Sequence, residues 1–135
     1  MVYRRQDGYY RRAKEEGYRS RAAYKLIELS RRHGLIRTGD HVVDLGAWPG
    51  GWLQVAAELA GPRGRVVGVD LEPIEPITNP VVSLLRGDVR DPAVQRAIVH
   101  LSGGMVDVVL SDMAPKLTGV RARDTARSAE LAEVA

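Results

Sequence analysis

The sequence predicts an α/β fold with a parallel sheet. Helical and strand patterns alternate along the chain, the strand candidates are short apolar runs, and acidic residues follow three of them. Short continuous apolar runs are typical of strands buried on both faces, as in parallel sheets. Right-handed crossovers then bring the carboxyl ends of the strands to one edge, where ligands bind in such folds.

The composition suits one domain that lacks a metal site. The chain has 135 residues, 44% of them hydrophobic, which is enough for a real core. There is no cysteine, and the three histidines show no metal-ligand spacing. No apolar run approaches a membrane span, and the charged N-terminus does not resemble a signal peptide. We therefore expect a soluble, cytoplasmic protein.

Positive charge is concentrated near the N-terminus. Residues 1–33 hold ten of the 20 Lys and Arg residues and four of the 17 acidic residues, a net charge of +6, whereas the remainder carries −3. Within them, residues 1–19 form a predicted basic arm, whose cations can neutralise phosphates and whose tyrosines can stack on bases. A solvated, partly ordered tail is the alternative interpretation.

The first helix is predicted over residues 20–32. Ser20 is a candidate N-cap and Gly34 a natural C-terminal stop. Lys25 borders the apolar face of this helix, a position that also suits an ordinary surface lysine. That face is formed by residues at helical spacing, namely Ala23, Leu26, Ile27 and Ser30.

Residues 41–52 read His-Val-Val-Asp-Leu-Gly-Ala-Trp-Pro-Gly-Gly-Trp, which predicts a strand, a tight glycine loop and the start of a helix. Glycines let a ligand approach the backbone, and the helix start presents N–H groups. The spacing matches neither the dinucleotide fingerprint nor the phosphate-binding loop, which disfavours an NAD-type oxidoreductase. A nucleoside ligand without phosphates, such as S-adenosylmethionine, fits better. The alternative is a turn that only joins strand to helix.

The second strand is predicted over residues 65–70 and ends in Asp70. The helix before it ends near Gly61. Asp70 lies 20 residues beyond Gly50, a spacing that allows a carboxylate to bind a ribose diol in nucleoside-binding α/β folds. Residues 71–80 contain three prolines and are predicted to be largely loop.

Two further strands and two helices complete the predicted alternation. A strand is predicted over residues 81–85. The helix after it has Asp91 as its N-cap and Pro92 as its first residue, and it ends near residue 101. A fourth strand spans residues 106–112, and a last helix follows Asp124.

Three acids at strand ends are predicted to converge beside the glycine loop: Asp70, Asp88 and Asp112. One such acid is easily explained as a helix cap, but three are harder to explain by structure alone. Together they can accept hydrogen bonds from ribose hydroxyls, an adenine amino group and an amino-acid ammonium.

Three motifs resemble those of the FtsJ/RlmE family, in the family's order and with similar spacings. They are Ser-Arg-Ala-Ala-Tyr-Lys-Leu at 20–26, Asp-Leu-Gly-Ala-x-Pro-Gly-Gly-Trp at 44–52, and Ser-Asp-Met-Ala-Pro at 111–115 followed by Gly119. Members are S-adenosylmethionine-dependent RNA ribose 2′-O-methyltransferases with a Rossmann-like class I methyltransferase fold. The resemblance implies that residues 20–135 form an S-adenosylmethionine-binding methyltransferase domain.

The resemblance also implies site residues. The family's cofactor contacts match Gly50, Trp52, Asp70, Asp88 and Asp112. Lys25 and Asp112 match the first two members of its Lys-Asp-Lys-Glu catalytic tetrad. The second Lys and the Glu, which lie on later strands in the family, have no counterpart in these 135 residues. We therefore expect a domain without its C-terminal strands, with residues 106–110 as an exposed apolar edge.

By resemblance, the reaction is metal-free methylation of a ribose 2′-hydroxyl in RNA. The substrate implied is a uridine of large-subunit (23S) ribosomal RNA. A cofactor- and RNA-binding module without catalysis is the alternative, because half of the tetrad has no counterpart. Two positions depart from the family pattern: Trp48 replaces a small residue, and Lys116 replaces a frequent Asn.

Overall fold

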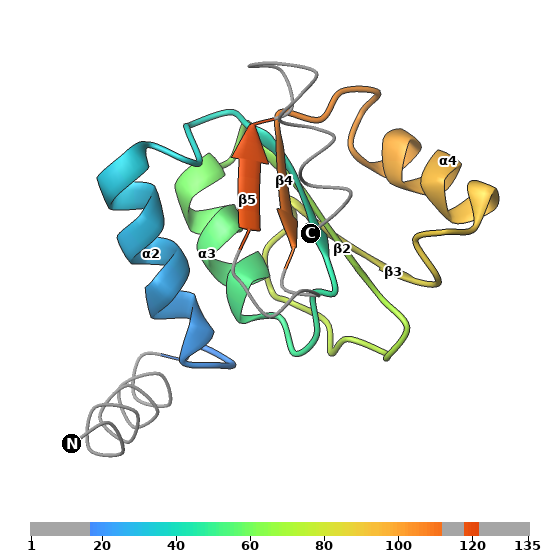
Figure 1. Cartoon of the computed structure of the whole chain (residues 1–135), viewed down its shortest axis with the longest axis horizontal. Coiled ribbons are helices and arrows are strands. Elements are labelled where there is room, and N and C mark those ends of the chain that lie inside the picture. The colour runs from blue at the N-terminus through green and yellow to red at the C-terminus, as the bar shows by residue number, and fades with distance from the viewer. Residues whose placement is uncertain (1–16, 112–117, 122–135) are drawn as a thin grey trace.

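The computed structural model of the chain describes residues 17–111 and 118–121 (Figure 1). Its helices are α2 (Ala22–His33), α3 (Gly51–Ala60) and α4 (Pro92–Leu101), and its strands are β1 (His41–Leu45), β2 (Arg65–Asp70), β3 (Val82–Arg86), β4 (Val108–Ser111) and β5 (Thr118–Arg121).

The strands form a single sheet in the order β3-β2-β1-β4-β5, and the first four are parallel. Leu45 of β1 lies opposite Val69 of β2 on one side and opposite Ser111 of β4 on the other. Asp70 at the end of β2 lies opposite Arg86 of β3. The carboxyl ends of β1 to β4 therefore meet at one edge, and the predicted α/β fold with a parallel sheet is confirmed.

The expectation that residues 106–110 form an exposed edge of the sheet is wrong. β4 is shorter than predicted, and β5 pairs with it in antiparallel orientation, with Val109 opposite Val120. The pairing satisfies backbone N–H and C=O groups of β4 that would otherwise be open. The pattern of apolar runs does not predict β5, because Thr118–Arg121 is only four residues long and is not an apolar run.

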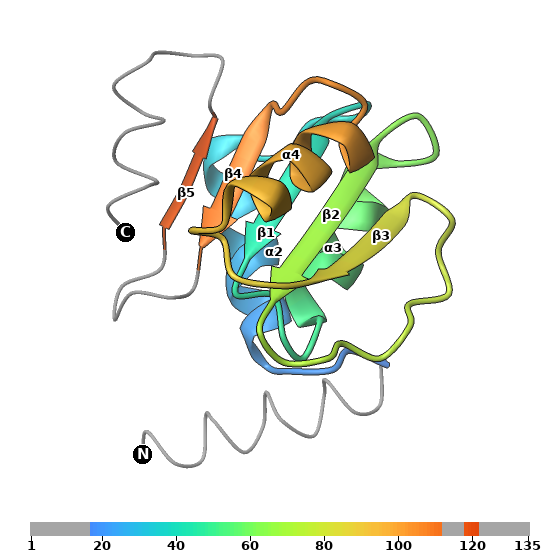
Figure 2. The same ribbon diagram turned by 90° about the vertical axis from the view of Figure 1, so that its right-hand side faces the viewer.

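Helices cover both faces of the sheet. α2 and α3 lie on one face and α4 on the other, as the two perpendicular views show (Figures 1 and 2). The core under α2 and α3 is the larger, and the core under α4 is built around Val43, Val67, Val69 and Ile98. Gly68 in the middle of β2 allows α3 to pack closely, because a Cβ there would overlap the side chain of Leu53.

Two predicted helix boundaries are confirmed. Gly34 ends α2 in a left-handed conformation with φ of 59°, and its N–H donates to the carbonyl of Ser30. The carboxylate of Asp91 accepts from the N–H of Ala93 at 2.9 Å, and Pro92 is the first residue of α4. The loop predicted over residues 71–80 is also present, without helix or strand.

The assignment of Ser20 as the N-cap of the first helix is wrong. The N-cap is Arg21, no side chain caps this end, and the Ser20 carbonyl accepts from the N–H of Ala23 at 3.2 Å. Ser20 instead packs against Gly51 of α3, where an added Cβ would overlap its hydroxyl. A tertiary contact thus sets the position of this serine.

Residues 1–16 of the predicted basic arm, the turn at 113–115 and the helix after Asp124 lie outside the described residues. Within the described part, none of the helices has the length and apolarity that crossing a membrane requires.

Candidate functional site

The glycine loop, residues 46–50, is anchored to the end of β2. The N–H groups of Gly46 and Ala47 both donate to the carbonyl of Val69, at 2.8 and 3.0 Å. The next N–H, that of Trp48, donates to the Asp70 carboxylate at 2.9 Å. Three consecutive backbone donors of the loop are therefore satisfied by two adjacent residues of one strand.

The Asp70 carboxylate accepts hydrogen bonds from the backbone and can still accept more from a ligand. Its Oδ2 accepts from Trp48, and its Oδ1 accepts from the N–H of Glu72 at 2.9 Å. A carboxylate oxygen has two lone pairs, so each oxygen can accept a further hydrogen bond. Asp70 is half-buried at the sheet edge, and it can hold the loop and bind a ligand hydroxyl at the same time.

A hollow of about 340 Å³ opens at the carboxyl edge of the sheet. This volume is within the range of roughly 300–1,000 Å³ typical of small-molecule sites. The structure brings two of the predicted site residues, Asp70 and Asp88, together on its wall. The complete lining is Gly46, Trp48, Val69, Asp70, Leu71, Gly87, Asp88 and Val89.

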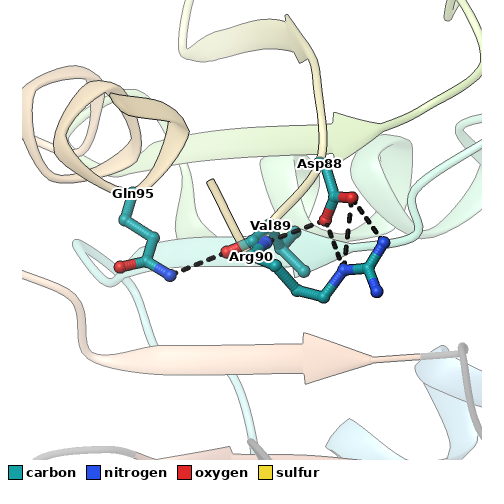
Figure 3. A network of polar contacts seen from close by, with 4 residues as sticks. All are labelled: Asp88, Val89, Arg90 and Gln95. Carbon is teal, nitrogen blue, oxygen red and sulfur yellow. Dashed lines mark hydrogen bonds and ion pairs between the residues drawn. The ribbon is translucent and has the colours of Figure 1, made fainter. Parts of the chain in front are cut away.

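Asp88 is held by Arg90, two residues further along the chain (Figure 3). The Arg90 guanidinium donates to Oδ2 at 2.7 Å and to Oδ1 at 3.0 Å, and its backbone N–H donates to Oδ1 at 2.9 Å. These hydrogen bonds lower the pKa of Asp88 from 3.8 to about 2. Gln95 fixes the same turn by donating to the Val89 carbonyl at 2.9 Å. Asp88 therefore presents an ionised acceptor to the hollow at neutral pH.

Trp52 is placed differently from Asp70 and Asp88. Its side chain is only 5% exposed, and its indole N–H donates to the carbonyl of Ala22 at 2.9 Å, which links α3 to the first turn of α2. Gly50, the N-cap of α3, has φ of +118°, a conformation that favours glycine. As glycine has no side chain that could cap the helix, the first turn of α3 has no side-chain cap.

A second, much smaller hollow of about 20 Å³ also adjoins the glycine loop. Gly46 and Trp48 line both hollows, and Asp44, which is 1% exposed, lines the smaller one. Asp44 was not among the predicted site residues. The available signal was an acid in the middle of an otherwise apolar strand.

The predicted catalytic pair is described only in part. Lys25 is exposed on α2, one turn beyond Ala22, whose carbonyl binds the Trp52 indole. Asp112 and Lys116 lie outside the described residues, so the pairing of Lys25 with Asp112 stays a prediction. Across residues 17–111 and 118–121, no three His, Asp or Glu side chains cluster in a way that could hold a metal ion.

Comparison with known proteins identifies close relatives. The family model for FtsJ-like methyltransferases matches residues 18–135. Ribosomal RNA large subunit methyltransferase E of Natronomonas pharaonis is 56% identical over 131 residues, which cover 97% of this chain and 51% of that protein. The protein of the same name from Methanothermobacter thermautotrophicus is 50% identical over 130 residues, with 96% and 62% covered. The chain thus spans about half to three-fifths of these relatives.

A solved structure agrees with this assignment. The crystal structure described as a ribosomal RNA methyltransferase of Plasmodium falciparum superposes with a TM-score of 0.60 at 31% identity, covering 84% of this chain and 66% of that one. The predicted methyltransferase fold is confirmed, and membership implies a methyl donor. On the family match and these relatives, the chain belongs to the FtsJ-like methyltransferase family.

Proposed function

We propose that this chain carries the S-adenosylmethionine site of an RNA ribose 2′-O-methyltransferase. The observation that carries the proposal is the meeting of Asp70 and Asp88 on one hollow beside the glycine loop. The substrate we assign is large-subunit ribosomal RNA, because the relatives are named for methylation of that RNA. The assignment of a uridine ribose as the acceptor follows from the family resemblance. This function assigns the protein to the cytoplasm, with ribosomal RNA as its partner.

The groups around the hollow suit a nucleoside that lacks phosphates. Asp70 has acceptor capacity for ribose hydroxyls, and ionised Asp88 can accept from an adenine amino group. Leu71 and Val89 offer apolar surface to the flat faces of a base. The uncapped N-terminus of α3 beside Gly50 favours an anionic group, such as the carboxylate of an amino acid.

Trp52 is assigned to the site through its backbone and its position. Its buried indole holds the first turn of α2 against the start of α3, so it fixes the helix end that faces the cofactor. We assign Asp112 to both the cofactor set and the catalytic set, following the family motif that starts at Ser111.

When bound, S-adenosylmethionine supplies a methyl group on a positively charged sulfur. The residues of the chain contribute position and charge. Holding two reactants in line can lower a barrier by roughly 7–11 kcal/mol. By the family resemblance, the second Lys of the tetrad, for which these 135 residues have no counterpart, accepts the proton of the 2′-hydroxyl. We assign Lys25 to stabilise the negative charge that develops on the 2′-oxygen, and Asp112 to orient the base. The basic arm, residues 1–19, is assigned to RNA phosphates, with affinity that falls as salt rises.

The test is methyl transfer from S-adenosylmethionine carrying a labelled methyl group. Two proteins are compared, this chain and this chain joined to the C-terminal half of the Natronomonas pharaonis relative. Each is offered free large-subunit ribosomal RNA and intact large subunits. We expect labelled RNA in which the modified nucleotide resists alkaline cleavage, because a 2′-O-methyl group removes the attacking hydroxyl.

A matched variant isolates the catalytic assignment. Lys25→Met in the joined protein should lose transfer at least 100-fold and keep cofactor binding, whereas Arg31→Met on the same helix should change neither by more than twofold. Label in a base, or no label in RNA from a protein that binds the cofactor, would contradict the proposed reaction. Transfer by the joined protein but not by the 135-residue chain would identify this chain as a binding module.

A further inference from the structure

Arg19 joins two loops that are distant in the sequence. Its guanidinium donates to the carbonyl of Pro49 at 3.1 Å, and to the carbonyls of Glu75 and Pro76, each at 2.6 Å. Pro49 belongs to the glycine loop, whereas Glu75 and Pro76 belong to the segment 71–80 that follows β2. One side chain thus links the glycine loop to segment 71–80. Each of these segments begins with a residue that lines the hollow, Gly46 in the first and Leu71 in the second.

Arg19 is itself fixed by α3. Its backbone N–H donates to the side-chain oxygen of Gln54 at 2.8 Å, and the amide nitrogen of Gln54 donates back to the carbonyl of Gly17 at 2.9 Å. The aliphatic part of the side chain packs on Gly50, where an added Cβ would lie 3.2 Å from Cδ and 3.1 Å from Nη1. The guanidinium therefore has a defined position rather than a free one.

The chemistry of these contacts requires arginine. The three acceptors are backbone carbonyls from two separate segments, and a planar guanidinium has five donors in a fixed fork. A lysine ammonium keeps the charge but is a compact, strongly hydrated group without this fork. The expected loss from Arg19→Lys is therefore a loss of geometry and not of charge.

We propose that Arg19 is a positioning residue for the cofactor site. Arg19 holds the glycine loop and segment 71–80 at a fixed separation and so shapes the hollow before a ligand enters. Binding then costs less conformational entropy, because these two segments are already ordered. The inference rests on the proposed function, since it takes the hollow to be the S-adenosylmethionine site. It removes Arg19, the last residue of the basic arm, from the residues assigned to RNA phosphates, and gives it a role in cofactor affinity instead.

The test compares Arg19→Lys with Arg21→Lys in the full chain. Arg21 is exposed and two residues away, so both variants keep the net charge of the same segment. Calorimetric titration with S-adenosylmethionine should show at least tenfold weaker binding for Arg19→Lys and a change below twofold for Arg21→Lys. RNA affinity measured without the cofactor should change less than twofold in both.

Hydrogen exchange supplies a readout that loss of overall stability does not reproduce. In Arg19→Lys we expect faster exchange confined to residues 46–52 and 71–79, with β2 and β4 unchanged. If Arg19→Lys unfolds at the assay temperature, Gln54→Ala, which removes the anchor of the Arg19 backbone, should weaken cofactor binding in the same direction. In Arg19→Ala, added guanidinium below its denaturing range should restore part of the affinity.

Two results would overturn the inference, and they are distinguishable. Wild-type affinity for the cofactor in Arg19→Lys, with weaker RNA binding, would show that Arg19 contacts phosphate and does not shape the hollow. Absence of cofactor binding by the folded wild-type chain would contradict the proposed function, and the inference with it.

Discussion

Two segments at the carboxyl edge of the sheet carry the candidate site, and they are held in different ways. The glycine loop is fixed by residues that are distant in the sequence. Asp70 binds Trp48 across 22 residues, and Arg19 binds Pro49 across 30 residues. The turn at residues 88–91 is fixed by residues nearby in the sequence, because Arg90 binds Asp88 two residues away and Gln95 binds Val89 six residues away. Gly87, just before the turn, reaches further, by donating its N–H to the carbonyl of Asp70.

This difference separates what folding must assemble from what the local sequence supplies. Contacts between distant residues require the closure of long loops, which costs conformational entropy before any bond forms. Contacts across two to six residues need little closure. Substitutions that remove long-range contacts around the glycine loop should therefore lower the stability of the domain more than substitutions in the turn.

The largest expected loss of stability distinguishes Trp52, at the start of α3, from Trp48 in the glycine loop. Trp52→Ala removes a buried ring that bonds to Ala22, and we expect it to lower the free energy of unfolding by about 3–5 kcal/mol. Trp48→Ala removes a ring that is 57% exposed, and we expect a change below about 0.5 kcal/mol. Urea unfolding followed by far-ultraviolet circular dichroism measures both, and equal losses would contradict the buried position of Trp52.

A smaller loss is expected from the helix that follows the turn. Asp91→Ala removes the cap that binds the N–H of Ala93, which should cost about 1 kcal/mol of unfolding free energy. Asp91→Asn keeps a side-chain oxygen at the cap and should cost only a few tenths of that. Thermal and urea unfolding of the pair check the prediction, and a larger effect of Asn than of Ala would refute the capping role.

The smallest effect is a change in titration. The Arg90 hydrogen bonds hold the pKa of Asp88 at about 2, below its ordinary 3.8, so the pair's contribution to stability is complete above pH 3.8 and is lost as the pH falls through about 2. Arg90→Gln should return the pKa of Asp88 toward 3.8 and remove this acid dependence. Arg96→Gln, an exposed arginine on α4, should leave it unchanged, and NMR titration of the carboxyl carbon measures both.

The parts of the fold that could be predicted from the sequence are those that the local pattern of residues controls. The run Arg-Val-Val-Gly-Val-Asp gave β2 with its observed bounds, and the Asp91-Pro92 pair gave the start of α4. The meeting of Asp70 and Asp88 followed from the parallel sheet, because each acid comes at or just after the end of a neighbouring strand.

The features that the sequence does not predict depend on contacts between distant residues. Ser20 has the composition of an N-cap, but its packing on Gly51 of α3 decides its position. Arg19 looks like one more cation in a basic arm, and its three carbonyl partners become visible only when the loops come together. β5 is too short and too polar to show in a pattern of apolar runs.

The most direct test of the central claim is calorimetric titration of the folded chain with S-adenosylmethionine, with Asp70→Asn and Asp91→Asn alongside. Both variants remove one carboxylate from the same edge, but Asp70 lines the hollow, whereas Asp91 caps α4. We predict saturable binding by the wild type. Asp70→Asn should weaken the affinity at least tenfold, equivalent to about 1.4 kcal/mol, and Asp91→Asn should change it less than twofold. Equal binding by all three proteins, or no binding by the folded wild type, would contradict the assignment of this hollow as the cofactor site.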